Sequence, residues 1–311
     1  MIVKRQLNQS GQIVVIALLA MVVVLAIALV IVGRSMMEIA TSTKTEESSR
    51  AFSAAEAGIE KALQDPSFIS NGGGNLLSFG NNAQASVDIN ANLPDSGLPL
   101  EHPPIGKESF AQFWLADPYS DTLSGGYQQS KFNVYFGAVK DANGQTIDYL
   151  ADPENQPAIE VMVVYFDGSS YKSIRYLYDS YGSLATETNN DRRANGFGSC
   201  ALGRNLSVET NRINHFTVFY CGVTVPSSGT DLPAGTKIMV RARVLYSSLS
   251  HPIAVGPVDR NFSIPKQATI SKSTGTVGNV QRSIEVFKQQ SVMPQFLDYA
   301  LFSASTLQRQ Q

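Results

Sequence analysis

An uninterrupted apolar segment near the start of the chain constrains its fold more than any other feature. Residues 13–32 read IVVIALLAMVVVLAIALVIV, which is 20 residues drawn only from Ile, Val, Leu, Ala and Met. As a helix rising about 1.5 Å per residue, this segment would be about 30 Å long, the hydrocarbon thickness of a bilayer. A core helix of a soluble protein normally carries a polar stripe, and this segment has none. We therefore predict a membrane-inserted helix over 13–32.

The helical character continues well beyond the apolar segment. No proline occurs before Pro66, which removes a backbone donor and disfavours helix at the residue before it. We expect one helix of about 80 Å over 12–64. In its second half, Phe52, Ala55, Ile59 and Ala62/Leu63 recur at three- and four-residue spacing, which predicts a stripe that faces a partner surface. Glu46 and Arg50 form an i,i+4 pair on the opposite, solvated side.

The residues that flank the apolar segment indicate whether it is cleaved off and how it is oriented in the membrane. A secretory signal peptide has a shorter apolar region followed by a cleavage site of small residues, whereas this segment runs to Val32 and is followed by Gly33 and Arg34. Removal after the segment is not expected. Positive charges stand on both sides, with Lys4 and Arg5 before it, so the positive-inside rule alone leaves the topology open.

Two stretches carry a resemblance to a known class of proteins. The start, MIVKRQLNQSG followed by QIVVIALLAMVVVL, resembles a type IV prepilin leader, which is short, basic and ended by a glycine directly before the apolar stretch. The segment AFSAAEAGIEKAL, 51–63, is similar to the A-F-x-A-A-E-A-G-I-E-x-A stretch of the PilX group of minor pilins. Together they cover about the first 65 residues. The resemblance implies the pilin lollipop: a long N-terminal helix packed on a large external domain.

The resemblance also implies a processing site. Prepilin peptidase would cut between Gly11 and Gln12, and the new amine of Gln12 would be a candidate for methylation. A glycine suits an enzyme that grips an extended backbone at the membrane face, although Gly11 could merely start the helix. Filament packing would fall to Ile16, Phe52, Ala55, Glu56 and Ile59.

Ile16 departs from the usual pilin pattern. Most pilins have Glu as the fifth mature residue, where its carboxylate is thought to pair with the terminal amine of a neighbouring subunit. Ile16 stands there in this chain. A carboxylate buried in an apolar bundle is unfavourable unless it is paired, so this isoleucine removes both the penalty and the docking contact. Tip-type minor pseudopilins share the feature, but some PilX-like chains could simply tolerate an apolar residue.

Beyond Pro66 the composition of the sequence changes to turn-forming residues and short runs that favour β-strands. Candidate strands rich in Val, Ile, Tyr and Phe begin at Lys131, Ala158, Ser173, His215, Lys237 and Gln281. The segment 167–171 around Gly168 predicts a hairpin between two of them. We expect an α+β protein: a leader over 1–11, a helix over 12–65 and an antiparallel β-rich external domain over 66–311, with an inserted lobe at 67–156 as one possibility.

The two cysteines and one acidic turn are the other candidate sites. Cys200 and Cys221 flank a strand-like run, and outside the cytoplasm we expect them to form a disulfide that stabilises the fold by about 3 kcal/mol; two free thiols are the alternative. Asp141, Asn143 and Asp148 in DANGQTID resemble a calcium loop weakly. This segment lacks the bidentate Glu of an EF-hand, and an Asn-Gly turn needs no metal.

No pattern of catalytic residues stands out. GFGSCALG, 196–203, fits neither GxGxxG nor GxSxG, and His102, His215 and His251 are isolated. Phe110, Phe113 and Trp114 fit core packing better than a contact surface. With 24 Lys+Arg against 26 Asp+Glu, nucleic acid is disfavoured as a partner. We expect no enzyme activity and no cofactor.

The sequence thus predicts a structural minor pilin or pseudopilin. We expect it in the cytoplasmic membrane as a single-pass protein with an external C-terminal domain, and then at or near the tip of a type IV pilus or related secretion filament. Expected partners are other pilins, prepilin peptidase, the assembly platform and the lipid bilayer. The alternative is a bitopic surface binding protein or adhesin, but such an anchor needs neither the Gly11 junction nor the 51–63 motif.

Overall fold

The computed structural model describes residues 10–64, 75–80, 82–120, 122, 125–141, 143–181, 192, 195–227 and 229–290. The predicted leader, 1–11, therefore lies almost wholly outside the described residues. The chain divides into two compact units, which are described separately. The helix unit comprises Met1–Ile89 and Ser271–Val286, and the sandwich unit comprises Asn90–Ile270 and Phe287–Gln311. The span of the predicted lobe, 67–156, includes parts of both units.

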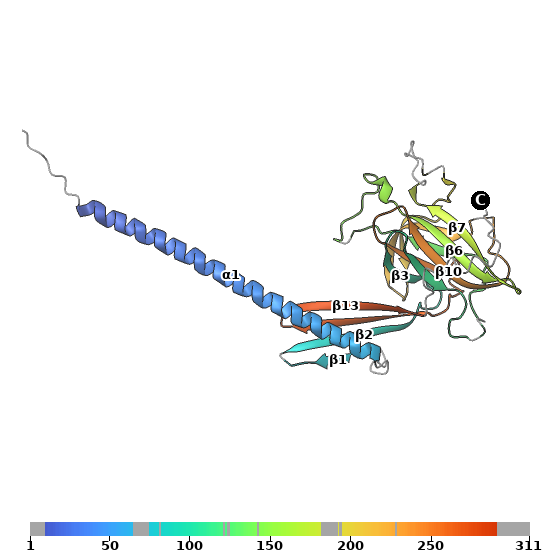
Figure 1. Cartoon of the computed structure of the whole chain (residues 1–311), viewed down its shortest axis with the longest axis horizontal. Coiled ribbons are helices and arrows are strands. Elements are labelled where there is room, and N and C mark those ends of the chain that lie inside the picture. The colour runs from blue at the N-terminus through green and yellow to red at the C-terminus, as the bar shows by residue number, and fades with distance from the viewer. Residues whose placement is uncertain are drawn as a thin grey trace, which may run out of the picture. The chain divides into compact units, whose positions relative to one another are not determined.

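A single helix, α1 (Ser10–Gln64), makes up most of the helix unit (Figure 1). Its 55 residues correspond to about 80 Å. The sequence favours this length because good helix formers and apolar residues run from Ser10 to Gln64 with no proline among them. The structure confirms the predicted helix through its last residue, Gln64.

A four-stranded sheet accompanies the second half of α1. Its strands are β1 (Asn75–Ser78), β2 (Ala83–Leu93), β12 (Ala268–Val277) and β13 (Val280–Gln289), in the order β1-β2-β12-β13. β1 and β2 pair antiparallel, with Ser78 opposite Gln84. Within the helix unit, β2 alternates buried Ala83, Ala85 and Val87 with exposed Gln84, Ser86 and Asp88, so one face packs and the other is solvated.

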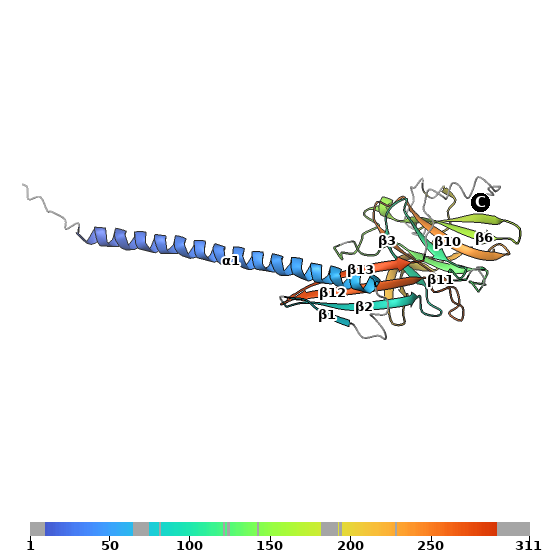
Figure 2. The same ribbon diagram turned by 60° about the horizontal axis from the view of Figure 1, so that its bottom comes forward.

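The helix packs on this sheet through very small side chains. Figures 1 and 2 both show the C-terminal part of α1 lying along β2, β12 and β13. Ala51 and Ala54 form a buried cluster with Ala83, Ala85 and Val277. A Cβ atom added to Gly275 would lie 1.8 Å from the carbonyl oxygen of Ala51. The backbones of β12 and α1 therefore approach as closely as glycine alone permits.

The sandwich unit contains two antiparallel sheets. The four-stranded sheet has the order β4-β10-β6-β7, and its strands are β4 (Phe110–Trp114), β10 (Thr236–Leu245), β6 (Ala158–Phe166) and β7 (Tyr171–Asp179). The five-stranded sheet has the order β3-β11-β5-β9-β8. Its strands are β3 (Leu100–Ile105), β11 (His251–Pro257), β5 (Phe132–Phe136), β9 (Phe216–Val225) and β8 (Gly203–Glu209). A short 3-10 helix, η2 (Pro153–Asn155), precedes β6.

One apolar core joins the two sheets. Every second residue of β6 and β10 points into it, and the facing side chains come from β5, β9 and β11. Residues of this core include Val161, Val163, Val240, Ala242, Val134, Val223 and Ile253, all fully buried. β6 and β10 are buried almost continuously, because Met162, Val164 and Met239 on their other face belong to a second buried cluster. The half-buried alternation that the sequence predicted for such runs is therefore wrong for these two strands, although their β-branched side chains are typical of strands. Phe113 belongs to the same core, which confirms its predicted packing role.

The predicted hairpin is present. β6 and β7 pair antiparallel from Phe166 opposite Tyr171 to Ala158 opposite Asp179. Gly168 has a φ of +100°, which glycine adopts readily and other residues rarely do. Asp167 Oδ1 accepts hydrogen bonds from the backbone N–H groups of Ser169 and Ser170, both at 2.8 Å. The turn is thus formed by Asp-Gly chemistry that was readable in the sequence.

Candidate functional site

The exposed surface of α1 is the principal candidate for a functional site. Side chains from Val14 to Glu46 are all exposed in the chain by itself. Among the described residues, α1 is the one helix long and apolar enough to cross a membrane. Its apolar residues show no polar stripe, so every side of the helix between residues 14 and 32 presents the same hydrocarbon surface.

The free energy of that surface shows why it needs an apolar environment. Between residues 14 and 32, fifteen large apolar side chains are exposed, from 48% for Val23 to 76% for Met21. Removing such a side chain from water stabilises by about 1.5–3 kcal/mol, so the total is on the order of 20–45 kcal/mol. That exceeds the whole stability of a typical domain, about 5–15 kcal/mol. Lipid or an apolar protein bundle therefore suits this segment far better than water does.

Ile16 lies on this lipid-like surface with 67% of its side chain exposed. Gly11 and Gln12 fall within the first turn of α1, and their side chains are outside the described part of the structure. Because Gly11 is helical here, a peptidase that needs an extended strand would have to unwind this turn. Glycine favours such unwinding, since it is among the weakest helix formers. Cleavage between Gly11 and Gln12 stays a prediction.

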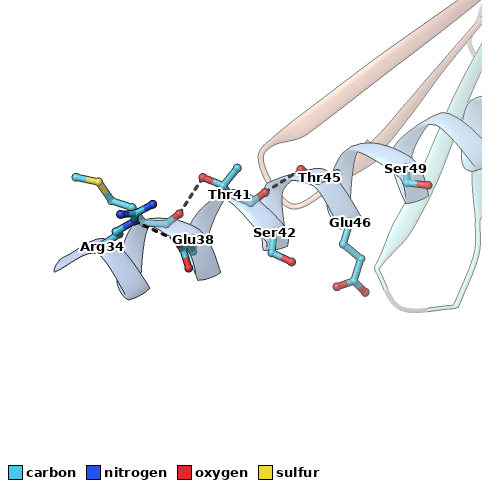
Figure 3. Close-up of a pocket in the computed structure, with 8 residues that line it drawn as sticks. Arg34, Glu38, Thr41, Ser42, Thr45, Glu46 and Ser49 are labelled. Carbon is cyan, nitrogen blue, oxygen red and sulfur yellow. Dashed lines mark hydrogen bonds and ion pairs between the residues drawn. The ribbon is translucent and has the colours of Figure 1, made fainter. Parts of the chain in front are cut away.

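A shallow, open groove follows the apolar surface along one face of α1, between the candidate membrane span and the sheet. Figure 3 shows side chains that line this groove. They are Arg34, Met37, Glu38, Thr41, Ser42, Thr45, Glu46 and Ser49. Arg34 Nε lies 3.3 Å from Glu38 Oε1, and Arg50 NH2 lies 3.2 Å from Glu46 Oε1. The charges are therefore balanced, and exposed i,i+4 pairs of this kind contribute only a few tenths of a kcal/mol.

The threonines near this groove are internally satisfied. Thr41 Oγ1 donates to the carbonyl oxygen of Met37 at 2.8 Å, and Thr45 Oγ1 donates to that of Thr41 at 2.9 Å. Thr43 bonds the carbonyl of Ile39 in the same way at 3.0 Å. A hydroxyl that donates back to its own helix needs no water for that donor. This part of the helix can therefore be covered by another helix without leaving these donors unpaired.

Sequence reasoning did not find this groove, although its spacing carries the signal. Polar side chains at 34, 38, 41, 42, 45 and 49 recur every three or four residues, as on one face of a helix. Apolar periodicity predicts only that the helix continues through this segment, because it does not register a polar stripe.

The structure corrects the predicted stripe on the second half of α1. Ala55 and Ile59 are buried, as are Ala51, Ala54, Gly58 and Ala62, and the contacts of Ala51, Ala54 and Gly58 are with the chain's own sheet. Phe52 is 46% exposed and Leu63 is 44% exposed, so neither belongs to that buried stripe. The reason is steric: Gly58 and Gly275 bring helix and sheet so close that only small side chains fit between them. Glu56 is exposed beside Phe52 on the uncovered side.

The predicted disulfide is confirmed. Cys200 and Cys221 are joined, with Cα atoms 5.4 Å apart. Cys221 is the fully buried partner in β9, and Cys200 belongs to the segment leading into β8. The bond fastens the middle of the GFGSCALG segment to the five-stranded sheet. This segment is thereby assigned a structural role in the sandwich unit.

The weak calcium candidate is organised as a turn. Asp141 Oδ1 accepts from the backbone N–H groups of Asn143 at 2.9 Å and Gln145 at 2.8 Å. Asp148 Oδ1 accepts from the N–H of Leu150 at 3.0 Å. Within the described ranges, no group of three His, Cys, Asp or Glu side chains is placed to hold a metal ion. The carboxylates of this loop bond to the backbone, as expected for an Asn-Gly turn.

Buried charges in the sandwich unit are paired for structure. Arg192 NH2 donates to Asp179 Oδ1 at 2.7 Å, and the guanidinium lies over the rings of Tyr181 and Tyr246. Glu160 accepts from Arg243 Nε at 2.9 Å. Removing one of these cationic partners would leave a buried carboxylate without compensation. These pairs stabilise the packing of strands and loops.

His251 is the buried histidine of the sandwich unit. Its Nδ1 accepts from the backbone N–H of Ala138 at 3.0 Å, and its Nε2 donates to Ser247 Oγ at 2.7 Å. Burial lowers the pKa of His251 to about 4, below its ordinary value of 6.5. A proton on Nδ1 would also break the bond from Ala138. The neutral ring is therefore part of the fold.

Acid should weaken the sandwich unit through His251. Because its pKa is lowered in the folded state, the stabilisation is complete above about pH 6.5 and is lost as the pH falls towards 4, by about 3 kcal/mol. Denaturant unfolding of the full chain in detergent, measured between pH 7 and pH 4, should show this loss. The His251→Gln variant should be less stable overall, but its free energy of unfolding should depend less on pH. His215→Gln, at an exposed position, should keep the slope. An unchanged slope in His251→Gln would refute the assignment.

No protein-family model matches the chain. No curated protein matches its sequence. What the chain does is therefore inferred from its own helix, sheet and loops.

Proposed function

We propose that the chain is a structural subunit of the type IV pilin class, similar to the PilX group of minor pilins. It would insert in the cytoplasmic membrane through α1, be processed between Gly11 and Gln12, and enter a pilus or secretion filament at or near its tip. The observation that carries the proposal is the division of α1: an apolar half exposed on every side, and a second half packed on a sheet.

The mechanism that we propose is packing. In the membrane, the segment 13–32 lies in lipid; in a filament, the same side chains would contact the equivalent helices of other pilins. Lipid tails and a helical bundle are similarly apolar, so the transfer exposes little hydrocarbon to water. The assembly platform of the membrane would supply the work. The groove at residues 34–49 would then lie next to the helices of neighbouring subunits outside the bilayer.

This division of α1 supports a pilin more than a simple anchor. A bitopic binding protein needs about 20 apolar residues to cross the bilayer and no particular continuation of the helix. In this chain the helix continues without a break from the span into the sheet of the helix unit. A continuous rod transmits position from the membrane segment to the folded part, which a subunit of an ordered filament requires.

Ile16 sets the position that we propose within the filament. A carboxylate at this place would pair with the amine of a neighbouring subunit, and an amine left unpaired in an apolar bundle costs several kcal/mol. A subunit that lacks the carboxylate is thus disfavoured in the shaft. We expect this chain in sheared filaments at a small fraction of the major pilin. Quantitative mass spectrometry checks this, and abundance equal to the major pilin would rule out the tip position.

Ile16→Glu should move the subunit into shafts. If the restored pair contributes about 1.4 kcal/mol, incorporation should rise roughly tenfold relative to the major pilin. Ile16→Gln is the matched control, since it adds a polar group of the same length without the charge. Equal incorporation of both variants would contradict the mechanism. Presence in the membrane with complete absence from sheared filaments would favour the surface binding protein.

A further inference from the structure

A wholly exposed loop of the sandwich unit carries an unassigned acceptor pattern. Residues Val258 to Ser263, between β11 and β12, are all exposed. They read VDRNFS, so an asparagine is followed two residues later by serine and preceded two residues earlier by aspartate. Asn-x-Ser is the acceptor tripeptide of N-linked glycosylation when it lies in a surface loop on the external side of a membrane.

The loop presents the acceptor amide in a defined position. Asp259 Oδ1 accepts hydrogen bonds from both the backbone N–H and the side-chain Nδ2 of Asn261, each at 2.9 Å. The N–H of Phe262 donates to the carbonyl oxygen of Asp259 at 3.0 Å and closes the turn. The carboxylate therefore orients the amide that would be modified. A single acidic residue two positions before the asparagine achieves this within the loop itself.

Two contacts fix the ends of the loop without covering Asn261. Arg260 NH1 donates to Glu209 Oε2 at 2.7 Å, which ties the loop to the end of β8. Ser263 Oγ accepts from the N–H of Gly97 and lies 2.9 Å from Ser96 Oγ. Both Asn261 and Ser263 stay exposed in this arrangement. To bind the Ser263 hydroxyl, an enzyme would have to replace only the two hydrogen bonds that this hydroxyl makes to Gly97 and Ser96.

We propose that Asn261 is a site of N-linked glycosylation. The donor would be an oligosaccharide carried on a lipid pyrophosphate, the substrate of a membrane oligosaccharyltransferase. Nδ2 of Asn261 attacks the anomeric carbon of the first sugar and loses one proton to water; the bond from that carbon to the pyrophosphate oxygen breaks, and the lipid pyrophosphate leaves with the electron pair of that bond. Asp259 is a positioning residue. The external location of the loop rests on the proposed function, whereas its competence as an acceptor does not.

A second tripeptide in the chain serves as an internal comparison. Asn205-Leu206-Ser207 has the same spacing, but it lies within β8, where Leu206 and Ser207 are paired with residues of β9. Gly203 stands at the place that Asp259 takes in the loop. Asn8-Gln9-Ser10 also fits the tripeptide, but Asn8 falls in the predicted leader and would be removed with it. The structure therefore singles out Asn261.

The test uses the purified, folded full chain in detergent. It is incubated with a bacterial oligosaccharyltransferase and a lipid-pyrophosphate-linked oligosaccharide, and the products are followed by intact mass and peptide mapping. We expect one glycan on Asn261 and none on Asn205. Asn261→Gln and Ser263→Ala should abolish the modification, whereas Ser263→Thr should keep it. Asp259→Ala should slow it at least tenfold, and Asp259→Glu should restore it.

Controls separate the site from the enzyme and from the fold. A synthetic peptide spanning 257–265 shows that the enzyme and donor are active. If that peptide is modified while Asn261 of the folded chain is not, the proposal is wrong. Modification of Asn205 in preference to Asn261 would also overturn it. Because the reaction is run on purified protein, its outcome does not depend on processing at Gly11 or on filament entry, so the two proposals can fail separately.

Discussion

Gly275→Val should separate α1 from its sheet. A Cβ atom at this position would lie 1.8 Å from the carbonyl oxygen of Ala51 and 2.7 Å from the nitrogen of Ala55. Both are backbone atoms of a helix, so neither can move aside cheaply. We expect the helix unit to lose about 3 kcal/mol or more, at the upper end of overpacking effects. Hydrogen exchange of the full chain in detergent should show faster exchange in 51–62 and in β12.

Lys272→Val is the matched control for this variant. Lys272 lies on the same strand and is exposed, so a β-branched side chain there meets solvent and favours the strand. Exchange in α1 should then be unchanged. If Gly275→Val protects 51–62 as well as the natural chain does, the close backbone packing that we describe is not what holds the helix on its sheet.

Gly11→Leu should abolish processing by prepilin peptidase. The enzyme needs an extended backbone at the cleavage point, and Gly11 lies in the first turn of α1. Leucine stabilises the helix by about 1 kcal/mol relative to glycine and adds a side chain where the backbone must be gripped. We expect the uncleaved chain to accumulate in the membrane and to be absent from sheared filaments. Gly11→Ala should be processed poorly and not abolished, since alanine favours the helix at least as much as leucine but adds only a methyl group where the backbone must be gripped.

Gly33→Leu separates this effect from a general change in the helix. Gly33 belongs to the same helix and is exposed, and a Cβ atom added there meets nothing within 4 Å. Leucine at position 33 raises the helix propensity by the same amount as leucine at position 11, but at the other end of the apolar segment. Processing should proceed at the natural rate. Equal loss in the Gly11 and Gly33 variants would mean that the leader junction has no special role.

Local chemistry made much of the fold predictable. The apolar segment at 13–32 is 20 residues long and contains no glycine or proline to interrupt a helix, and Pro66 marks where the helix must end. β-branched and aromatic residues predicted strands such as β6, and Gly168 predicted the turn between β6 and β7. The bond between Cys200 and Cys221 followed from their number and their separation.

The face of the helix that packs on the sheet could not be found in the same way. Apolar periodicity favoured Phe52 and Leu63, because large side chains dominate hydrophobic patterns. The actual contact uses Ala51, Ala54 and Gly58, and it depends on Gly275, which lies far along the chain in β12. Close approach between backbones is a property of two surfaces together. The pairing of β2 with β12 is also non-local, because most of the sandwich unit lies between these two strands in the sequence.

The mature N-terminus tests the central claim most directly. Top-down mass spectrometry of the protein from membranes that contain prepilin peptidase should show a chain beginning at Gln12, with Met1 to Gly11 removed. Methylation of the terminal amine adds one CH2 group, so a further mass of about 14 Da would reveal it. An intact Met1 in these membranes, or cleavage beyond Val32, would contradict the proposal that this protein is a processed pilin.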